Sequence, residues 1–300
     1  MTLPRKQLIS IEETPYYHIV SRCVRRAFLC GSDPLTNRCY EHRRKWIQQR
    51  VKYLAGIFSI DICAYAVMHN HYHLVLKVSS TENWSNKQVL VYWAALCKLP
   101  RYCQQYLDGD QLGTSELEWV EEKIAIYRQR LMSISWFMKL LNQHIAIAAN
   151  AEDQCTGHFW ENRFKSQALL DESALLTCMV YVDLNPIRAA MARTPETSEL
   201  QERINTKTSD LLAFGQGIND LPYSLTDYMK LVDYTGRAIL INKLGYIPPE
   251  LHVITERLGL NPDSWLKRST AFHPKVLRLW VRLSNYDSFV QQLASSGTMA

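Results

Sequence analysis

The chain has 300 residues, of which 47% are hydrophobic and 21% are charged, and it carries a formal net charge of +5. This is the composition of an ordinary globular protein, and the length leaves room for a full core and a second module. No run of about 18 apolar residues occurs, so we expect no membrane span. The first residues lack the apolar stretch of a signal peptide, so we expect the protein to stay in the cytoplasm.

Cysteine spacing and charge distribution narrow the possibilities further. The eight cysteines are scattered and form no C-x-x-C pair, which argues against a structural zinc knuckle and against a disulfide framework. Residues 1–57 hold eleven lysines and arginines but only four acidic residues. Such a basic segment is either a footprint for phosphates or the solvated surface of a helix.

The first part of the chain predicts the order strand, helix, strand, strand. Residues 16–24 have the composition of a strand, and Asp33 is the expected N-cap of a helix that extends to about Gly56. Residues 58–68 predict a second strand. A third strand follows the tight connection at His69.

The remainder is predicted to be largely helical. An aromatic and basic segment over 158–169 predicts a final strand, and a helix then begins at Asp171 or Glu172. Pro186 either bends that helix or breaks it. A linker is expected after residue 193. The other predicted helical segments are 84–106, 115–150, 224–232, 249–258 and 274–283.

Two histidines on the third strand are the first candidates for chemistry. Side chains alternate along a strand, so His71 and His73 point to the same side, whereas Tyr72 points to the other. Two imidazoles on a rigid strand can hold one divalent cation. The plainer interpretation is a pair of half-buried histidines on the face of a sheet.

A tyrosine and an asparagine more than a hundred residues later are the second candidates. Tyr181 and Asn185 are four residues apart on one predicted helix and therefore share a face. If that helix packs on the sheet, a phenol and an amide oxygen can meet the imidazoles at a phosphoryl-transfer site, where the phenol attacks phosphorus. A helical tyrosine is more often a core residue, and Asn185 before Pro186 is also a helix-stop signal.

At this point the sequence resembles a known family. Residues 67–76 (VMHNHYHLVL) resemble the HUH motif of single-tyrosine transposases, in which two histidines flank a bulky residue. Residues 157–166 (GHFWENRFKS) and 181–189 (YVDLNPIRA) resemble two further motifs of that family, and 17–22 (YHIVSR) resembles its opening strand. The branch with the greatest similarity is that of the REP-associated tyrosine transposases, over about residues 14–192.

The resemblance implies an α+β fold, namely a ferredoxin-like HUH nuclease domain with a central antiparallel sheet and flanking helices. The expected division is a transposase domain over 1–192, with a helical insertion at about 79–130, and a mostly helical C-terminal extension over 193–300. The implied activity is metal-dependent cleavage and rejoining of single-stranded DNA through a 5′-phosphotyrosine intermediate. The implied partner is single-stranded or hairpin DNA, which places the protein at the nucleoid.

The family's functional residues transfer by position. The resemblance assigns His71 and His73 as ligands of Mg²⁺ or Mn²⁺, Asn185 as an additional ligand, and Tyr181 as the nucleophile. His69 stands where the family usually has proline, and we expect a turn residue rather than a third ligand. The candidates for phosphate contacts are Arg22, Arg25, Arg26, Arg163, Lys165 and Arg188.

Other interpretations remain open at this stage. The chain could be a DNA-binding protein that descends from such an enzyme and no longer cleaves, or a metal phosphodiesterase in which water attacks and Tyr181 is structural. Phe159, Trp160 or Tyr72 could stack on bases, although a core position is the more common one for such a tryptophan. The protein could act as a monomer or as a homodimer.

Overall fold

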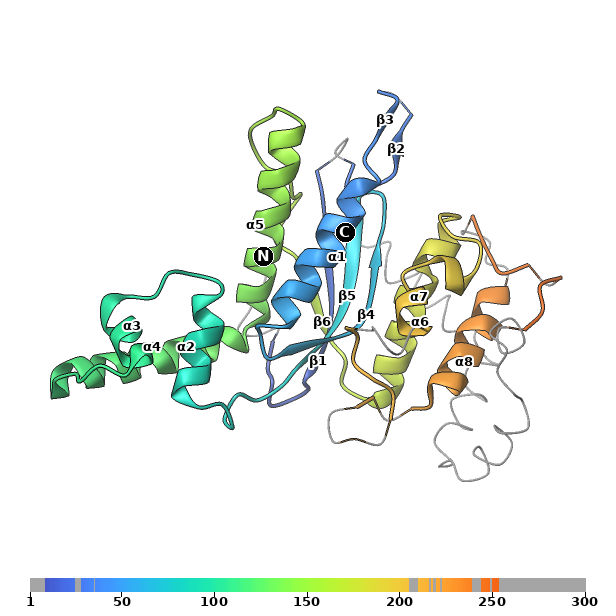
Figure 1. Cartoon of the computed structure of the whole chain (residues 1–300). Coiled ribbons are helices and arrows are strands. Elements are labelled where there is room, and N and C mark those ends of the chain that lie inside the picture. The colour runs from blue at the N-terminus through green and yellow to red at the C-terminus, as the bar shows by residue number, and fades with distance from the viewer. Residues whose placement is uncertain are drawn as a thin grey trace.

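The computed structural model describes residues 9–24, 28–34, 36–204, 210–215, 217, 220–221, 223–238, 244–248 and 250–253. At its centre is a four-stranded antiparallel sheet with helices on both faces (Figure 1). This arrangement confirms the predicted α+β class with a central antiparallel sheet. Within the described residues no helix is long and apolar enough to cross a membrane.

The sheet has the strand order β4-β5-β1-β6. Its members are β4 (Ile60–Val67), β5 (His71–Val78), β1 (Tyr16–Arg22) and β6 (Lys165–Ala168). In the central β1–β5 pair, Val20 lies opposite His73 and Arg22 lies opposite His71. The predicted strands over 16–24 and 58–68 are therefore found, whereas the last one is shorter than expected.

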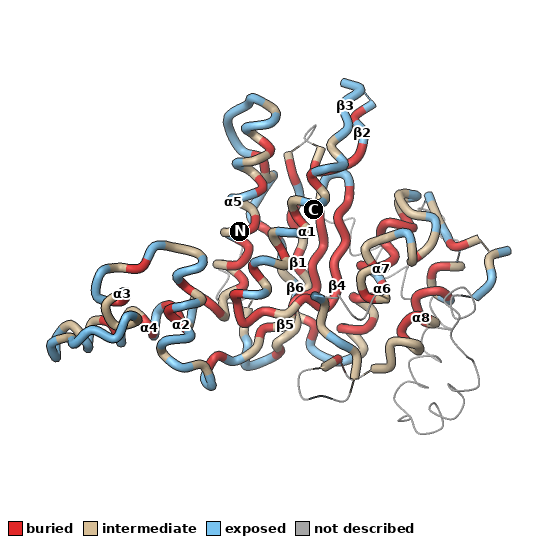
Figure 2. Tube along the Cα trace, in the orientation of Figure 1, coloured by how far each residue is buried: buried red, intermediate tan, exposed pale blue. Residues whose placement is uncertain are grey.

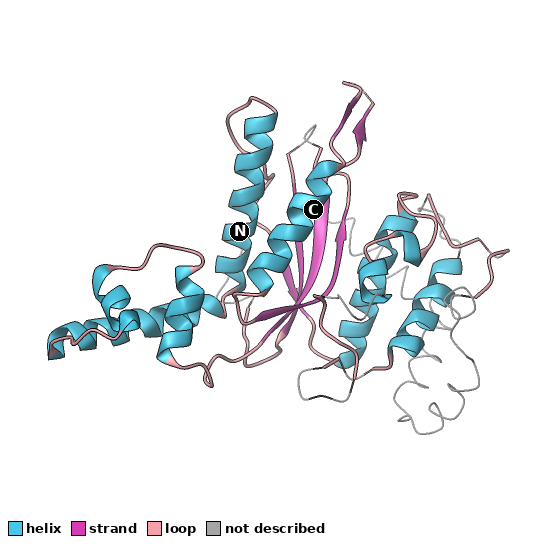
Figure 3. Ribbon diagram, in the orientation of Figure 1, coloured by secondary structure: helices cyan, strands magenta, loops and turns pink. Residues whose placement is uncertain are grey.

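One face of the sheet is covered by α1 (His42–Ala55) and α5 (Ile134–Glu152) (Figure 3). Strand residues such as Tyr17, Tyr72 and Leu74 are fully buried in the same cluster as Ile47 and Leu141 of these helices. Along the strands these residues alternate with those of the other face, so each strand serves two separate cores. Figure 2 shows the strands as the most continuously buried part of the chain.

The opposite face is covered by α6 (Glu172–Arg188), which carries the candidate tyrosine. Ala64, Ala66 and Val75 form the sheet side of this second core, and Leu176 and Val180 form the helix side. The alanines are small and allow the helix backbone to approach the strands closely. Asp171 caps the helix by accepting a hydrogen bond from the amide of Ala174 at 2.7 Å, as the sequence predicts.

The segment between β5 and α5 forms a helical projection (Figure 1). It contains α2 (Asn86–Ala94), α3 (Arg101–Asp108) and α4 (Thr114–Leu131). α2 ends at Ala94 and α3 begins after its N-cap Pro100, so the helix predicted over 84–106 is two helices. Ser133 starts α5 as its N-cap, so the single helix predicted over 115–150 is two helices.

The described part of the C-terminal extension packs on α6 through α7 (Gln201–Ile204) and α8 (Leu225–Arg237). The amide of Leu212 donates to the carbonyl of Ile62 at 2.8 Å, so this segment also covers the outer edge of β4. The helix predicted over 224–232 corresponds to α8. The helices predicted over 249–258 and 274–283 lie wholly or mostly outside the described residues.

The helix with the predicted N-cap Asp33 begins eight residues later than expected, after Glu41. Instead, β2 (Ser32–Asp33) pairs antiparallel with β3 (Arg38–Cys39), and α1 starts at His42. Asp33 accepts a hydrogen bond from the hydroxyl of Thr36 at 2.6 Å, so it stabilises a turn instead of a helix. Asn37 has a φ of 55°, in the left-handed region that asparagine tolerates and a right-handed helix excludes.

A buried polar contact joins the extension to α6, and it yields a stability prediction. The hydroxyl of Tyr228 on α8 donates to the carboxylate of Asp183 at 2.5 Å, and both side chains are buried. Replacement of Tyr228 by Phe leaves a buried carboxylate with one donor fewer. We expect the free energy of unfolding to fall by about 1–3 kcal/mol in urea titrations. Tyr102→Phe, at an exposed position on α3, should change it by much less; equal effects would contradict this account.

Candidate active site

The two candidate histidines lie next to each other at the start of β5. The ring centroids of His71 and His73 are 4.9 Å apart, so the two imidazoles share one side of the strand as predicted. His73 is buried, and His71 is half-buried at the end of the sheet. The pair sits on the face that packs against α6, because Ala66, the neighbour of His73 on β4, belongs to the α6 core.

The turn before β5 fixes His71. The Nδ1 atom of His71 lies 2.7 Å from Oδ1 of Asn70, an oxygen that can only accept, so Nδ1 carries the proton. The turn itself is tied to the end of β1, since the amide and the thiol of Cys23 both contact the carbonyl of Asn70, at 2.9 and 3.1 Å. In this tautomer the lone pair of the ring is on Nε2 of His71.

A third histidine joins the pair, one that the sequence did not single out. The Nε2 atom of His18 on β1 lies 3.0 Å from Nδ1 of His73, and the two rings stack with centroids 5.2 Å apart. Burial lowers the pKa of His18 to about 4, so its ring is neutral at physiological pH. A neutral His18 can therefore accept a hydrogen bond from Nδ1 of His73.

Helix α6 places Tyr181 beside these rings. Its ring centroid is 5.7 Å from that of His73 and 6.3 Å from that of His18, both at right angles. The neighbouring Val180 is buried against the sheet, whereas Tyr181 is 47% exposed. The phenol is therefore close to the imidazoles and also open to a large substrate, which is the juxtaposition that the sequence predicts.

Asn185 lies one helical turn beyond Tyr181 and is buried. Its amide nitrogen donates to the carbonyl of Tyr181 at 3.0 Å. This bond leaves the amide oxygen for another partner. Within the described residues no hydrogen bond links Asn185 to a histidine, so its role as a ligand remains a prediction.

No ready-made metal cage occurs in the part of the chain that the structure describes. There, no group of three or more His, Cys, Asp or Glu side chains is arranged to hold a metal ion. His69 in particular turns away toward another segment, since its ring would lie 2.4 Å from a Cβ atom added to Gly31. A cation at His71 and His73 would therefore take further ligands from an amide, from water or from the substrate.

The candidate phosphate contacts separate into three groups. Arg22, Arg163 and Lys165 are exposed. Arg22 is opposite His71, and Lys165 is opposite Val20, which in turn is opposite His73, so both cations lie on the histidine face of the sheet. Arg25 and Arg26 are outside the described residues.

Arg188, a predicted phosphate contact, has a structural role instead. It is buried, and its guanidinium donates to the carbonyls of Thr235 at 2.6 Å and Ala238 at 2.5 Å. It anchors α8 to α6 and is not placed to contact a phosphate. The sequence could not reveal this, because the carbonyls that bind Arg188 lie about fifty residues away in a region without a recognisable motif.

The aromatic residues considered for base stacking are core residues. Tyr72 and Phe159 are buried, and Trp160 packs its ring against both of them, at centroid distances of 5.6 and 5.0 Å. The indole nitrogen of Trp160 donates to the carbonyl of Asn142 at 2.8 Å. These rings support the histidine strand from its other side.

The sequence alone does not identify His18 as a neighbour of His73. It lies opposite Val75, two residues beyond His73, so the two histidines meet only as diagonal neighbours across the β1–β5 pair. The pairing register is needed to see this, and one sequence does not supply it. The sequence offered one hint. His18 is a polar residue on the opening strand, and it is an even number of residues from Arg22, so the two side chains point to the same face.

Comparisons with known proteins give one distant likeness. No protein-family profile matches the chain, and no curated protein matches it. Among solved structures, a REP-associated tyrosine transposase bound to a REP hairpin aligns with 73% of this chain and 97% of its own, at 12% sequence identity and a TM-score of 0.37. An overlap this loose establishes no shared activity, so the function has to be inferred from the site.

Asn142 on α5 gives a test of how the histidine strand is held. Its amide accepts from the hydroxyl of Tyr72 at 2.5 Å and donates to the hydroxyl of Ser21 at 3.0 Å. Asn142→Ala leaves two buried hydroxyls without this partner. We expect the free energy of unfolding to fall by about 1–3 kcal/mol. Gln143→Ala, at the adjacent exposed position of the same helix, is the control, and equal losses in the two variants would refute the role of Asn142.

Proposed function

We propose that the protein is a metal-dependent single-stranded DNA endonuclease and strand transferase, in which Tyr181 forms a 5′-phosphotyrosine intermediate. The observation that carries the proposal is the position of an exposed phenol 5.7 Å, between ring centroids, from a histidine that has a second histidine beside it. These groups come from segments more than a hundred residues apart, yet they converge at one point on the sheet. A purely structural tyrosine on α6 would have no need of exposure.

In this proposal the hydroxyl of Tyr181 attacks a backbone phosphorus. The new bond joins the phenolic oxygen to the 5′-phosphate, the bond to the 3′ oxygen breaks, and the leaving strand keeps a free 3′-hydroxyl. An ordinary phenol loses its proton only near pH 10, so the attack requires a positive field at the phosphate and a group that takes the proton. Reversal of the same step with a different 3′-hydroxyl joins two strands.

The donor set fits a hexacoordinate cation such as Mn²⁺ or Mg²⁺. Nδ1 of His71 faces an acceptor, and Nδ1 of His73 faces the neutral His18, so both Nε2 atoms can serve as ligands. Imidazole nitrogens favour Mn²⁺ over Mg²⁺, which prefers oxygen. When bound, the cation would polarise the phosphodiester and stabilise charge on its oxygens. Asn185 would supply an oxygen ligand one turn from Tyr181.

His18 acts on the metal ligand and not on the substrate. A histidine that binds metal through Nε2 needs a partner for its Nδ1 hydrogen, and such partners typically change metal affinity by about 10–100-fold. His18 is the partner at 3.0 Å from His73. We therefore assign it as a positioning residue that holds His73 in the correct tautomer and orientation.

The exposed cations around the site suit a DNA strand. Arg22 and Lys165 lie on the histidine face, and Arg163 precedes β6. They would position a strand through its phosphates without reading its sequence. Arg25 and Arg26 stay in the proposal as candidates. A hairpin or an extended single strand would meet the same groups, and such a DNA-bound protein would lie at the nucleoid.

The architecture also supports the proposal. The strand order β4-β5-β1-β6, with α1 after the first strand and α5 before the last, agrees with the arrangement expected of a ferredoxin-like domain. The C-terminal extension clamps α6 through Tyr228 and Arg188, so the tyrosine helix stays on its own sheet. This favours a monomer in which one chain supplies both the tyrosine and the histidines, with a transposase domain over 1–192 and an accessory extension over 193–300.

A covalent adduct tests the role of Tyr181. The protein with Mn²⁺ should cleave a single-stranded hairpin oligonucleotide and give a protein–DNA band that survives denaturing electrophoresis. Tyr181→Phe should abolish both the band and the cleavage, because only the nucleophilic oxygen is removed. Tyr102→Phe should retain both. Cleavage that persists in Tyr181→Phe would instead show attack by water, and binding without any cleavage would show a silent protein.

Metal binding tests the histidines independently of DNA. Electron paramagnetic resonance of free Mn²⁺ should report binding to the wild-type chain and loss of binding in His71→Ala. His18→Phe should weaken the affinity for Mn²⁺ about 10–100-fold, because the stacked ring remains but the partner of Nδ1 is removed.

The conservative variant His18→Gln serves as the control for this prediction. Its amide oxygen can accept the same hydrogen bond, so it should recover much of the Mn²⁺ affinity. Wild-type protein that binds no Mn²⁺ would contradict the metal site. Equal affinities in wild type and His18→Phe would contradict only the positioning role of His18.

A further inference from the structure

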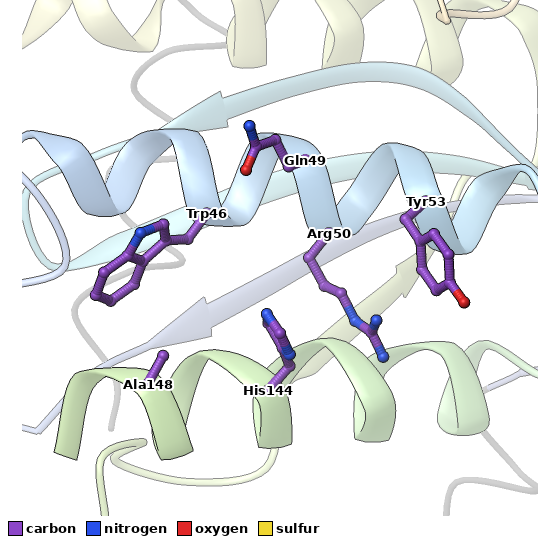
Figure 4. A pocket seen from close by; sticks show the side chains of 6 residues that line it. All are labelled: Trp46, Gln49, Arg50, Tyr53, His144 and Ala148. Carbon is purple, nitrogen blue, oxygen red and sulfur yellow. The ribbon is translucent and has the colours of Figure 1, made fainter. Parts of the chain in front are cut away.

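A small groove lies between α1 and α5, and it belongs to no part of the proposed active site. Its volume is about 280 Å³, and its walls are Trp46, Gln49, Arg50, Tyr53, His144 and Ala148. In Figure 4 the side chains of Trp46 and Arg50 from α1 and of His144 from α5 point into the space between the two helices. These helices cover the sheet face opposite to the one that holds Tyr181.

The groove carries a cation without an ionic partner. Among the described residues no carboxylate lies within ion-pair distance of Arg50, although its neighbours Arg43 and Arg44 on α1 are both paired. The Nε atom of Arg50 is buried and has no acceptor in the described part of the protein. None of the six wall residues is acidic. The groove is therefore suited to an anion.

Burial, followed by the field of Arg50, lowers the pKa of His144. This wall residue is then a neutral imidazole at physiological pH, and it can donate or accept a hydrogen bond without adding repulsion between like charges. Arg50 thus supplies the charge of the groove, and His144 supplies an adaptable polar contact across from it.

Two aromatic rings line the groove, one of them beside the guanidinium of Arg50. Arg50 lies over the ring of Tyr53, 5.0 Å from its centroid, and the hydroxyl of Tyr53 donates to the carbonyl of Ala95 at 2.7 Å. That bond holds the ring in place while 46% of the residue stays exposed. Trp46, at the other end, is half-buried and packs edge-on against His42 at 5.1 Å. An aromatic ring beside a guanidinium that has no carboxylate partner among the described residues, with a second ring further along the groove, is a combination that suits single-stranded nucleic acid.

We propose that this groove binds one nucleotide of a single DNA strand, with the phosphate on Arg50 and the base against Trp46 or Tyr53. The inference rests on the proposed function, since it gives the processed strand a second holding point away from Tyr181. The volume is at the lower limit of ligand pockets, which suits one nucleotide. A contact of this kind would be independent of sequence and sensitive to salt.

Fluorescence anisotropy with a labelled single-stranded oligonucleotide tests the proposal. The full-length protein would carry Tyr181→Phe, and the buffer would contain EDTA, so that neither the metal nor an adduct contributes. Arg50→Gln should weaken binding about tenfold and lower the slope of log affinity against log salt by about one. Arg101→Gln, which removes the same charge at an exposed position of α3, should change neither quantity.

Cross-linking locates the contact directly. An oligonucleotide that carries 5-iodouracil should cross-link to Trp46 or Tyr53 on irradiation, and peptide mass spectrometry should identify the residue. The yield should fall in Arg50→Gln. This experiment also reports on the unmutated groove if Arg50→Gln proves poorly folded by circular dichroism.

Three results would overturn the proposal. These are unchanged oligonucleotide affinity in a folded Arg50→Gln variant, cross-links confined to other residues, and displacement of the oligonucleotide by free deoxyadenosine monophosphate at equal concentration, which would indicate a site for free nucleotides. The covalent-adduct test of Tyr181 is separate. A groove that binds DNA in a protein without an adduct would leave this inference standing and remove the proposed activity.

Discussion

The antiparallel register between β1 and β5 is the constraint on which the candidate site depends. Ser21 and Tyr72 lie directly opposite each other in this register, and the side chain of Asn142 bonds to both. A slip of one residue would separate this pair and would turn every side chain of the strand to the other face. The same register brings His18 to His73 on the reverse side. One asparagine in the first core therefore fixes the geometry of the histidines in the second.

The two faces of the sheet consequently have different tasks. The face under α1 and α5 is closed by large buried rings and by the Asn142 hydrogen bonds, which make it rigid. The face under α6 includes small residues such as Ala64 and Ala66, and it brings the exposed phenol of Tyr181 close to the buried imidazole of His73. The extension adds a second layer over α6, where Tyr228 and Asp183 join the helices. Helix α6 thus lies between the sheet and the extension, and Tyr181 stays exposed beside the histidines.

The sequence alone predicted those features that follow from the regular spacing of side chains along one strand or one helix. Alternation along β5 predicted that His71 and His73 share a side, and the four-residue spacing on α6 predicted that Tyr181 and Asn185 share a face. It was insufficient wherever the decisive partner is distant. The hydrogen bond of His18 requires the strand register, and the burial of Arg188 requires the position of α8. At Asp33 a local turn competed with the helix that the capping signal predicts.

The basic residues of the first segment also show that distant partners cannot be predicted from the sequence. The basic excess of residues 1–57 suggests a continuous phosphate footprint, but Arg43 is paired with Glu152 and Asp153, and Lys52 with Glu202 and Asp210. These cations neutralise acids from later segments and hold α1 in place, so they cannot also neutralise a strand. Arg50 differs from these cations because its buried Nε atom has no acceptor among the described residues. The cations available to DNA are those left after the fold has formed its own ion pairs, and a count along the sequence cannot separate the two groups.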